Sequence, residues 1–501
     1  MDGNKMSEEN HTEQDKTDIL LDETDVSEQT EALVEPVIEN NTEKYLIYGV
    51  NDAPPIHITI ICALQQSLLS LSGQLIVSLL VAEAVCASDN NVFKAKLLSS
   101  TLFMSGITTV AMNLFGIRLP LYQGASASYI IPLLLVANTD GNFCTSESEN
   151  LLYNATDNTT SQDFPMEKIL FNVRAILISI CINWIICAIL TKFDVIPNNP
   201  DNPGFNARTD ARADIILNNP WVSVPYPGQY GAFGFSAAAF LSFMIATVMS
   251  ILDSIGDYYA CAKVARVPAP PKHAVNRGIL IEGVCSFLSG SVGCGHATST
   301  YGGNIGAIGV TKVASRRVFI CTGIFYILFG IFGKFSAVFI TIPYPVLGGA
   351  IVVMFGIFFG VVISNLEVTN MSSPRNMAII GLSIFIGLAV PTWAQKESSP
   401  VSTGYEQFDK IMSMLLGNPN LTGTLIACFL DNTVPGSLED RGIATWQVTD
   451  DDEDGVVDKT KYNEGYDVYT PLLPQRLLRS RIMRFIPFLP YRKTKLNHNG
   501  V

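Results

Sequence analysis

Apolar residues occur along this chain in runs of about 17 to 25, the length that an α-helix needs to cross roughly 30 Å of hydrocarbon. The runs predict an all-α polytopic membrane protein. The first run carries Gln65, Gln66 and Glu83 and is longer than one span needs, so we expect an interrupted helix there. The expected spans are Ile56–Cys86, Leu97–Ile117, Leu119–Ala137, Phe171–Leu190, Ala232–Ala262, Gly278–Val292, Val318–Phe332 continuing through Phe335–Ile342, Val346–Leu366, Met377–Trp393 and Ile411–Leu430.

Two segments depart from this apolar pattern. Tyr301–Thr311 is too short and too rich in glycine to cross a bilayer, and the preceding Gly293–Gly302 can run extended. A short helix opening near Asn304 would aim its N-terminal N–H groups at the membrane centre, where they can hold an anionic or carbonyl-bearing solute. Gln123–Ser128, inside the third expected span, has the same polar character. One broken segment in each half of a chain is typical of inverted-repeat transporters, which hold the solute between them.

Two acidic residues stand near the end of a long apolar run. Asp253 and Asp257 are spaced i, i+4, so both carboxyl groups lie on one face of a helix. Within hydrocarbon an Asp costs on the order of 3 kcal/mol on insertion scales, and such a residue is functional by default. The alternative places both at the helix end, in water beside the interfacial pair Tyr258 and Tyr259.

Composition supports the membrane assignment and limits what charge can reveal. The chain is 48% hydrophobic and 15% charged, and its net charge of −13 comes largely from acidic tails, so the charge says little about the solute. Nothing in the composition indicates nucleic-acid binding. The ten cysteines lie mostly in apolar stretches and the five histidines form no cluster, so we expect buried thiols, no disulfide framework and no metal site.

The polar segments predict a domain organisation. Asn154 and Asn158 stand in sequons, which indicate a glycosylated extracellular loop. The loop Lys263–Arg277 is basic and is therefore expected in the cytoplasm. The basic, apolar stretch Arg476–Lys495 suits either the inner leaflet or water. We expect a disordered acidic cytoplasmic tail (1–50), three transmembrane segments (51–137), the glycosylated loop (138–170), the remaining spans (171–434) and a cytoplasmic tail (435–501).

A set of motifs resembles the nucleobase-ascorbate transporter family, and most of all its animal branch of sodium-dependent vitamin C and nucleobase carriers. The resemblance covers about residues 50 to 443. The main matches are Asp253–Ala262, Pro270–Gly278, Asn304–Lys312 and Ser315–Arg317, supported by Arg118–Gln123, Pro225–Gln229, Ile342–Pro345 and Leu430–Glu439.

The resemblance implies about fourteen spans in two inverted halves, with a core domain that carries the solute and a gate domain. It also implies sodium-coupled uptake of nucleobases or ascorbate, with Na⁺ or H⁺ as the coupling ion and no other cofactor. A homodimer is compatible with it. The implied substrate-binding positions are Gln65, Ala127, Asp253, Tyr301, Gly303 and Asn304, and the implied cation-coupling position is Asp257.

Three positions depart from the family pattern. Gly303 stands where nucleobase carriers have Gln or Glu and vitamin C carriers have Pro, and it can donate only its backbone N–H. Asp253 replaces a longer Glu, and Gln66 replaces a His. These changes leave the choice between nucleobase and ascorbate open and favour altered recognition.

About three spans of the family fold, roughly the fourth to sixth, have no counterpart after the glycosylated loop. Their loss makes the crossing count disagree with the positive-inside assignment of Lys263–Arg277.

Two interpretations of the function follow: a secondary active transporter, or a transport-inactive truncated form or pseudo-carrier that binds or regulates a full-length relative. No charge ring or carbonyl filter indicates a channel. No nucleophile or metal motif accompanies the acids, so an enzyme is not expected. We expect the plasma membrane as location, with partial retention in the endoplasmic reticulum.

Overall fold

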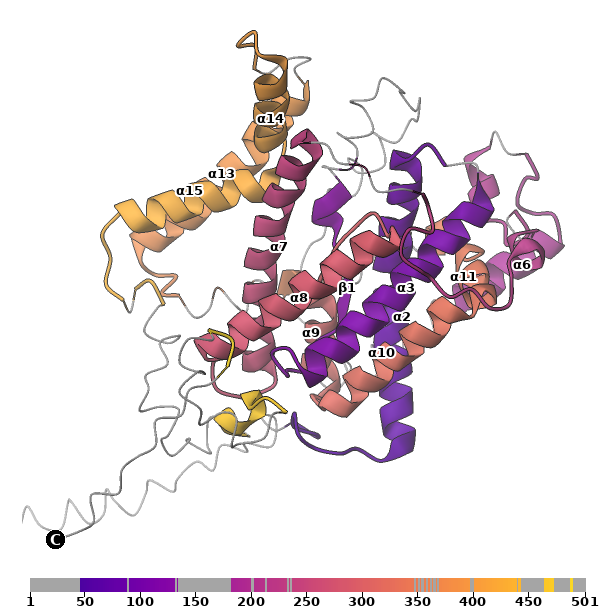
Figure 1. Ribbon diagram of the computed structural model, residues 1–501, viewed down its shortest axis with the longest axis horizontal. Helices are drawn as coiled ribbons and strands as arrows, with labels where there is room; N and C mark the ends of the chain where they lie inside the picture. Colours follow the sequence, from indigo (N-terminus) through magenta and orange to yellow (C-terminus); the bar gives the residue numbers. More distant parts are fainter. Residues whose placement is uncertain are drawn as a thin grey trace, which may run out of the picture. The chain divides into compact units, whose positions relative to one another are not determined.

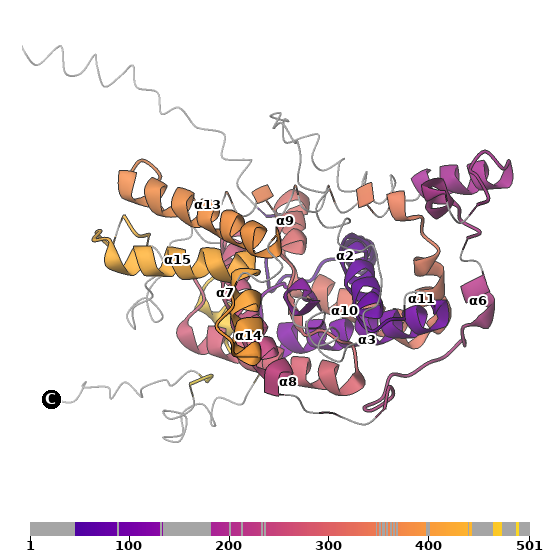
Figure 2. The ribbon, with the colours of Figure 1, turned by 90° about the horizontal axis from the view of Figure 1, so that it is seen from above.

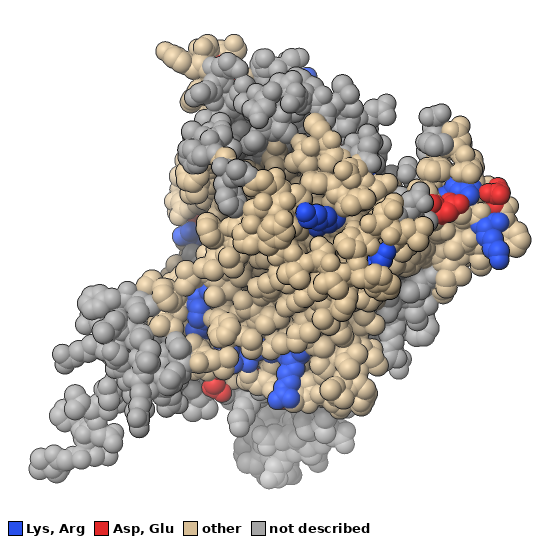
Figure 3. All heavy atoms as spheres, turned by 45° about the vertical axis from the view of Figure 1, so that its right-hand side comes forward, with Lys and Arg blue, Asp and Glu red and all other residues tan. Residues whose placement is uncertain are grey.

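The computed structural model is predominantly helical over the residues that it describes. These are 46–133, 182–346 and 369–442 with short gaps, scattered positions between 347 and 368, and the segments 464–472 and 487–489. Within them, the helices Ile56–Ala84, Asn91–Leu114 and Pro374–Ala394 are long and apolar enough to cross a membrane, and a bent pair makes a fourth candidate. Charged side chains are sparse on the face shown in Figure 3. The prediction of a polytopic helical membrane protein is confirmed at this level.

Helices α2 (Ile56–Ala84), α3 (Asn91–Leu114) and α10 (Arg316–Ile331) lie together, with α3 in contact with both neighbours (Figure 1). The predicted interruption of the first span is wrong, because α2 is one continuous helix of 29 residues. Its polar side chains face protein, so they do not need to break the helix to avoid lipid. Gln66 is 3% exposed and Gln74 is fully buried.

Helices α3 and α10 approach closely where both carry glycine. A Cβ atom added at Gly323 would lie 2.9 Å from the carbonyl oxygen of Gly106 and 2.7 Å from Cγ2 of Val110. Small residues permit this backbone approach, which drives helix association in membranes through packing. The α3–α10 contact supports the buried centre of the molecule from one side.

Two short extended segments lie in that centre. Strand β1 (Gln123–Ala125) pairs antiparallel with β2 (Thr298–Thr300). A 3₁₀ turn, Ala127–Tyr129, follows β1, and the ten-residue helix α9 (Gly302–Thr311) follows β2. Both segments that the sequence marks as interrupted therefore contain a short strand, and the two strands pair with each other. A half-helix after the first strand stays a prediction.

Helices α7 (Ala237–Val264) and α8 (Lys272–Val292) flank the paired strands, and both contact β2. Helix α8 ends at Gly293, whose φ of 83° lies in the left-handed region that glycine adopts without strain. The chain can therefore leave the helix abruptly and run extended into β2.

Helices α13 (Pro374–Lys396) and α15 (Pro419–Thr433) pack side by side in both ribbon views (Figures 1 and 2). The predicted single span Ile411–Leu430 is wrong, because α14 (Glu406–Leu416) ends before α15 begins. Pro419 lacks an N–H and stands at the first turn of α15, and the side chain of Asn418 caps that turn by accepting from the Leu421 amide at 3.2 Å.

The structure differs from two further predictions and describes only part of a third predicted span. Helix α10 does not run straight into the continuation predicted for it, because the chain bends by 91° between α10 and α11 (Gly333–Ile340). Cys86 is disulfide-bonded, whereas the sequence predicted buried thiols and no disulfide framework. Of the expected span Phe171–Leu190, the described part is a shorter apolar helix, Ile182–Lys192.

Candidate binding site at the paired strands

The paired strands are fixed in place by polar side chains from α2 and α3. The Thr109 hydroxyl accepts from the Gln123 amide at 3.0 Å and lies 3.2 Å from the Gln123 carbonyl oxygen. The side-chain oxygen of Gln74, Oε1, accepts from the Ala125 amide at 3.2 Å and from the Ser105 hydroxyl at 3.1 Å. A strand pair has unpaired edges, and these contacts satisfy part of the β1 edge inside the protein.

Glu282 joins both strands from α8. One of its carboxylate oxygens accepts from the Gln123 side-chain amide at 2.8 Å and from the Thr300 hydroxyl at 3.0 Å. Gln123 also donates to Thr300 at 2.9 Å. The Glu282 side chain is 6% exposed. Sequence reasoning missed it, although an acidic residue alone in the apolar run Gly278–Val292 is the signal that marks a functional position in a membrane span.

The N-terminus of α9 faces this assembly. Its N-cap residue, Tyr301, makes no side-chain cap, so the first N–H groups of the helix are not covered by a side chain. Gly303 and Asn304 are buried in the first turn. The Asn304 amide donates to the side-chain oxygen of Gln66 at 2.7 Å, and the Tyr301 hydroxyl donates to the Ala125 carbonyl at 2.9 Å. Three predicted site residues, Tyr301, Gly303 and Asn304, are thus brought together beside α2 and β1.

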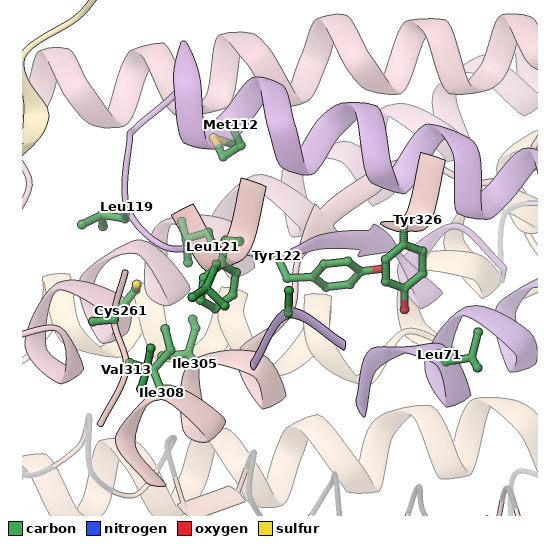
Figure 4. Packing of buried hydrophobic residues seen from close by; sticks show 14 of the residues in the cluster. Leu71, Met112, Leu119, Leu121, Tyr122, Cys261, Ile305, Ile308, Val313 and Tyr326 are labelled. Carbon is green, nitrogen blue, oxygen red and sulfur yellow. The ribbon is translucent and has the colours of Figure 1, made fainter. Parts of the chain in front are cut away.

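Aromatic rings line one side of the paired strands. The rings of Tyr122 and Tyr301 meet edge to face at 5.4 Å, and Tyr122 also contacts the Tyr326 ring at 5.1 Å (Figure 4). The Tyr326 hydroxyl donates to the Ser67 carbonyl at 2.7 Å. Tyr122 and Tyr326 are fully buried, so these rings pack against one another within the main hydrophobic cluster.

Several buried polar atoms around the strands have no hydrogen-bond partner within the described residues. Unpaired polar groups at membrane depth are costly, and in native proteins each calls for a missing partner such as a ligand or water. Gln65, a predicted site residue that is only half-buried, contributes one of them. The others on α2, β1, β2 and α9 are Gln74 Nε2, Gln123 Oε1, Thr298 Oγ1 and Asn304 Oδ1.

The two predicted acids lie within α7 rather than at its end. Asp253 stands eleven residues before the helix terminus at Val264, about 16 Å along the axis. Asp257 is 6% exposed, whereas Asp253 is exposed on the described surface. The carboxyl groups of Asp253 and Glu282 both interact electrostatically with Asp257. Asp257 therefore belongs to a buried acidic group with Glu282, and Asp253 lies at its outer edge.

Of the remaining predicted positions, Ala127 lies near α7, and the two glycosylation sites lie outside the described residues. Ala127 lies in the 3₁₀ turn after β1, which contacts α7. In the same turn, the Tyr129 hydroxyl donates to Thr247 of α7 at 3.0 Å. Asn154 and Asn158 lie outside the described residues, so their glycosylation stays a prediction. No group of three or more His, Cys, Asp or Glu suited to a metal ion occurs among the described residues.

Comparison with known proteins decides the family. A model described as "Permease family" matches residues 57–155 and 163–396. The chain belongs to this permease family. This permease is 30% identical to mouse (Mus musculus) solute carrier family 23 member 1, with 80% of the chain and 82% of that protein covered.

Two other relatives extend the comparison. The permease is 30% identical to human (Homo sapiens) solute carrier family 23 member 2 over 89% of the chain and 82% of that protein. It is 29% identical to nucleobase-ascorbate transporter 1 of Arabidopsis thaliana over 80% of the chain and 92% of that protein. The family resemblance read from the motifs is confirmed, and with it a role in membrane transport rather than enzymatic catalysis.

The alignments also bear on the length of this permease. The match to the human protein extends over 543 positions, which exceeds the 501 residues of the whole chain. The relatives therefore carry positions that this permease lacks.

Proposed function

We propose that this permease is a secondary active transporter that couples uptake of a nucleobase or ascorbate to the movement of Na⁺. The observation that carries the proposal is the set of buried polar atoms on α2, β1, β2 and α9 that have no hydrogen-bond partner among the described residues, together with the uncapped start of α9. Nucleobases and ascorbate are flat, carbonyl-bearing and rich in donors and acceptors. Such a solute can pair with the amide groups of Gln74, Gln123 and Asn304.

In this proposal, Asp257 and Glu282 couple ion movement to solute uptake. Asp257 and Glu282 are buried near each other, and a cation or proton between them would relieve their mutual repulsion. Since Glu282 also holds both strands, occupancy of the ion site and the arrangement of the solute site would be linked through one side chain. Sodium is preferred over H⁺ because the mouse and human relatives are both members of solute carrier family 23, and the motifs of this permease resemble those of the sodium-dependent animal branch.

The structure is compatible with a cytoplasmic position for both tails. The N-terminal segment at Asn51 and the basic loop at Pro268 both contact the C-terminal segment Glu464–Thr470, so these three parts lie on one side. The disulfide at Cys86 follows the far end of α2, where an extracellular, oxidising environment is expected. The proposed location is the plasma membrane.

A second candidate function is favoured by the alignment length. A chain that lacks positions present in its relatives is also suited to binding or regulating a full-length relative without transporting solute. The two candidates differ in what the purified chain does alone.

Uptake into liposomes separates them. The purified permease is reconstituted and given labelled purines, pyrimidines and ascorbate, each with and without an inward Na⁺ gradient, and an Asp257→Asn variant serves as the matched control. A working carrier accumulates at least one solute only with the gradient, and the variant loses that dependence. Absence of uptake for every solute, from protein with the melting behaviour of a folded sample, would support the regulatory function instead.

A further inference from the structure

The C-terminal tail contains a short segment that is packed into the protein core. Residues Tyr466–Tyr469 form a 3₁₀ turn, and Val468 and Tyr469 are 0% and 1% exposed. Both belong to the main hydrophobic cluster, together with residues of α2, α3, α9 and α10. Burial of this degree is unusual for a segment outside the spans, because chain ends remain ordered only where they are tied down.

Three arginines hold this segment by three consecutive carbonyl groups. Arg316 donates to the Val468 carbonyl at 3.1 Å, Arg277 donates to the Tyr469 carbonyl at 2.7 Å, and Arg118 donates to the Thr470 carbonyl. The Tyr469 hydroxyl donates to the Pro268 carbonyl at 2.6 Å. Hydrogen bonds from charged donors are stronger than those between neutral groups, so this anchorage is firm.

The arginines also join the parts of the chain that they come from. Arg277 donates to the Gly116 carbonyl at 2.6 Å, and Arg316 donates to the Arg118 carbonyl at 2.8 Å. Arg316 further donates to Asn51 at 3.0 Å, and the backbone amide of Asn51 donates to the Glu464 carboxylate at 2.9 Å. Among the described residues, none of the three arginines forms an ion pair with a carboxylate.

Each arginine stands at the base of an element that carries the candidate site. Arg118 precedes β1 by five residues, Arg277 precedes Glu282 on α8 by five residues, and Arg316 follows the end of α9 by five residues. Three like charges placed together repel one another and need a common acceptor to stay close. The carbonyl run of residues 468–470 is that acceptor.

We propose that Glu464–Thr470 is an intramolecular clamp that positions β1, α8 and α9 around the candidate site. Docking of the clamp on Arg118, Arg277 and Arg316 fixes the spacing of the three elements at their base. Release of the clamp loosens the paired strands and weakens solute binding, which gives the tail control over the carrier. Only the effect on uptake rests on the proposed transport function.

The clamp is tested in the full chain by Tyr469→Ala, which removes the buried ring and the bond to Pro268. Its matched control is Leu472→Ala, because Leu472 lies two residues beyond the clamp and is 57% exposed. Purified proteins are compared by amide hydrogen exchange over Gln123–Ala125 and Thr298–Thr300. We expect exchange there to accelerate about tenfold or more in Tyr469→Ala and to be unchanged in Leu472→Ala.

A pair of truncations covers the case in which Tyr469→Ala does not fold. A chain ending at Asn463 lacks the clamp, whereas one ending at Thr470 keeps it. A synthetic peptide of residues 464–470 is added to the shorter chain and is expected to restore slow exchange at β1 and β2. An Arg277→Gln version of the shorter chain should not respond to the peptide. Equal exchange in the two truncations, or peptide protection that survives Arg277→Gln, overturns the clamp.

The KM of uptake distinguishes a positioning role of the clamp from a purely structural role, which would leave KM unchanged. In a transporting sample, loss of the clamp raises KM about fivefold or more, because the site is no longer pre-organised, and added peptide lowers it again. An unchanged KM with reduced maximal uptake would show that the segment only stabilises the fold and would overturn its positioning role. If no solute is transported, the proposed function fails, and the exchange measurements still decide the clamp.

Discussion

Glu282 shows how much one side chain can determine in a membrane interior. Its carboxylate accepts from Gln123 and Thr300, so one buried group connects α8 to both strands. Such a buried acceptor is costly to remove, because the Thr300 hydroxyl would lose its acceptor and Gln123 would keep only its bond to Thr300. Substitutions at Glu282 can separate the contribution of its charge from the contribution of its hydrogen bonds.

We expect Glu282→Gln to fold and Glu282→Ala to be destabilised. Gln keeps a carbonyl oxygen for Gln123 and Thr300, whereas Ala leaves the Thr300 hydroxyl without its acceptor and Gln123 bonded only to Thr300. Loss of a buried partner costs about 1 to 3 kcal/mol. Thermal unfolding of the purified proteins measures this difference. A Glu282→Ala protein as stable as the parent would contradict the role given to the carboxylate in joining the strands.

Asp257 and Asp253 are expected to differ in function. Asp257→Asn should impair ion-coupled uptake, since Asp257 is buried near Glu282, while Asp253→Asn should weaken solute binding more than coupling. Loss of a buried polar partner worth about 1 to 3 kcal/mol corresponds to a tenfold or greater loss of affinity. Solute and Na⁺ dependence of uptake are measured for both variants. Parent-like kinetics in both would remove the acids from the site.

Gly303 offers a test in the opposite direction. It is buried in the first turn of α9 and offers only its backbone to a solute. If this limits nucleobase recognition, Gly303→Gln or Gly303→Glu should increase affinity for at least one base, as seen in competition uptake. Variants that reach the cell surface without a gain for any base would place recognition elsewhere.

At the scale of elements, the close approach of α3 and α10 depends on the absence of side chains. Gly106 and Gly323 face each other there, and each would clash with the partner helix if it carried a Cβ atom. Helix association in membranes relies on this kind of packing rather than on the exclusion of water. The contact matters for the site because α3 holds β1 through Thr109.

Gly323→Ala is therefore expected to destabilise the protein, by about 1 to 3 kcal/mol as for overpacked cores. The matched control is Gly283→Ala on α8, where an added Cβ atom meets nothing within 4 Å. Both variants are compared with the parent in thermal unfolding in detergent. A Gly323→Ala protein that unfolds at the same temperature as Gly283→Ala would show that the helices can separate at no cost.

At the scale of the whole molecule, contacts with the C-terminal segment restrict the topology. The N-terminal segment and the basic loop Lys263–Arg277 lie on one side through their common contacts with Glu464–Thr470. An even number of crossings must then separate them. The described helix Ile182–Lys192 has 11 residues and would cover about 16 Å, roughly half of a hydrocarbon core.

We expect that Phe171–Leu190 fails to span, or that molecules partition between orientations and are mostly retained in the endoplasmic reticulum. The segment carries Asn172, Arg174 and Asn183 within it or at its edge, so it costs least to leave out of the membrane. Glycosylation at Asn154 and Asn158 and cysteine labelling over Asn198–Trp221 on intact cells report the topology.

One uniform, surface-expressed population would contradict this expectation under three conditions. Asn154 would have to be glycosylated, Phe171–Leu190 and Ala232–Ala262 would each have to span once, and Lys263–Arg277 would have to be cytoplasmic.

The sequence by itself determined the properties that depend on neighbouring residues. Run length identifies the apolar helices, glycine content marks the broken segments near Gln123 and Tyr301, and i, i+4 spacing places Asp253 and Asp257 on one helix face. The break at Pro419 was missed because apolar residues on both sides of it favoured one span, although a proline within an expected span opposes a continuous helix.

Only the tertiary structure decided which distant residues meet. Gln123 and Glu282 are 159 positions apart, and no local pattern predicts that they share a hydrogen bond. The same holds for the arginines that donate to the carbonyl groups of residues 468–470. The polar composition of the tail does not predict that two of its residues are buried. Long-range packing sets these contacts, because the unmet hydrogen bonds of interrupted helices and strand edges must find partners wherever the fold brings them.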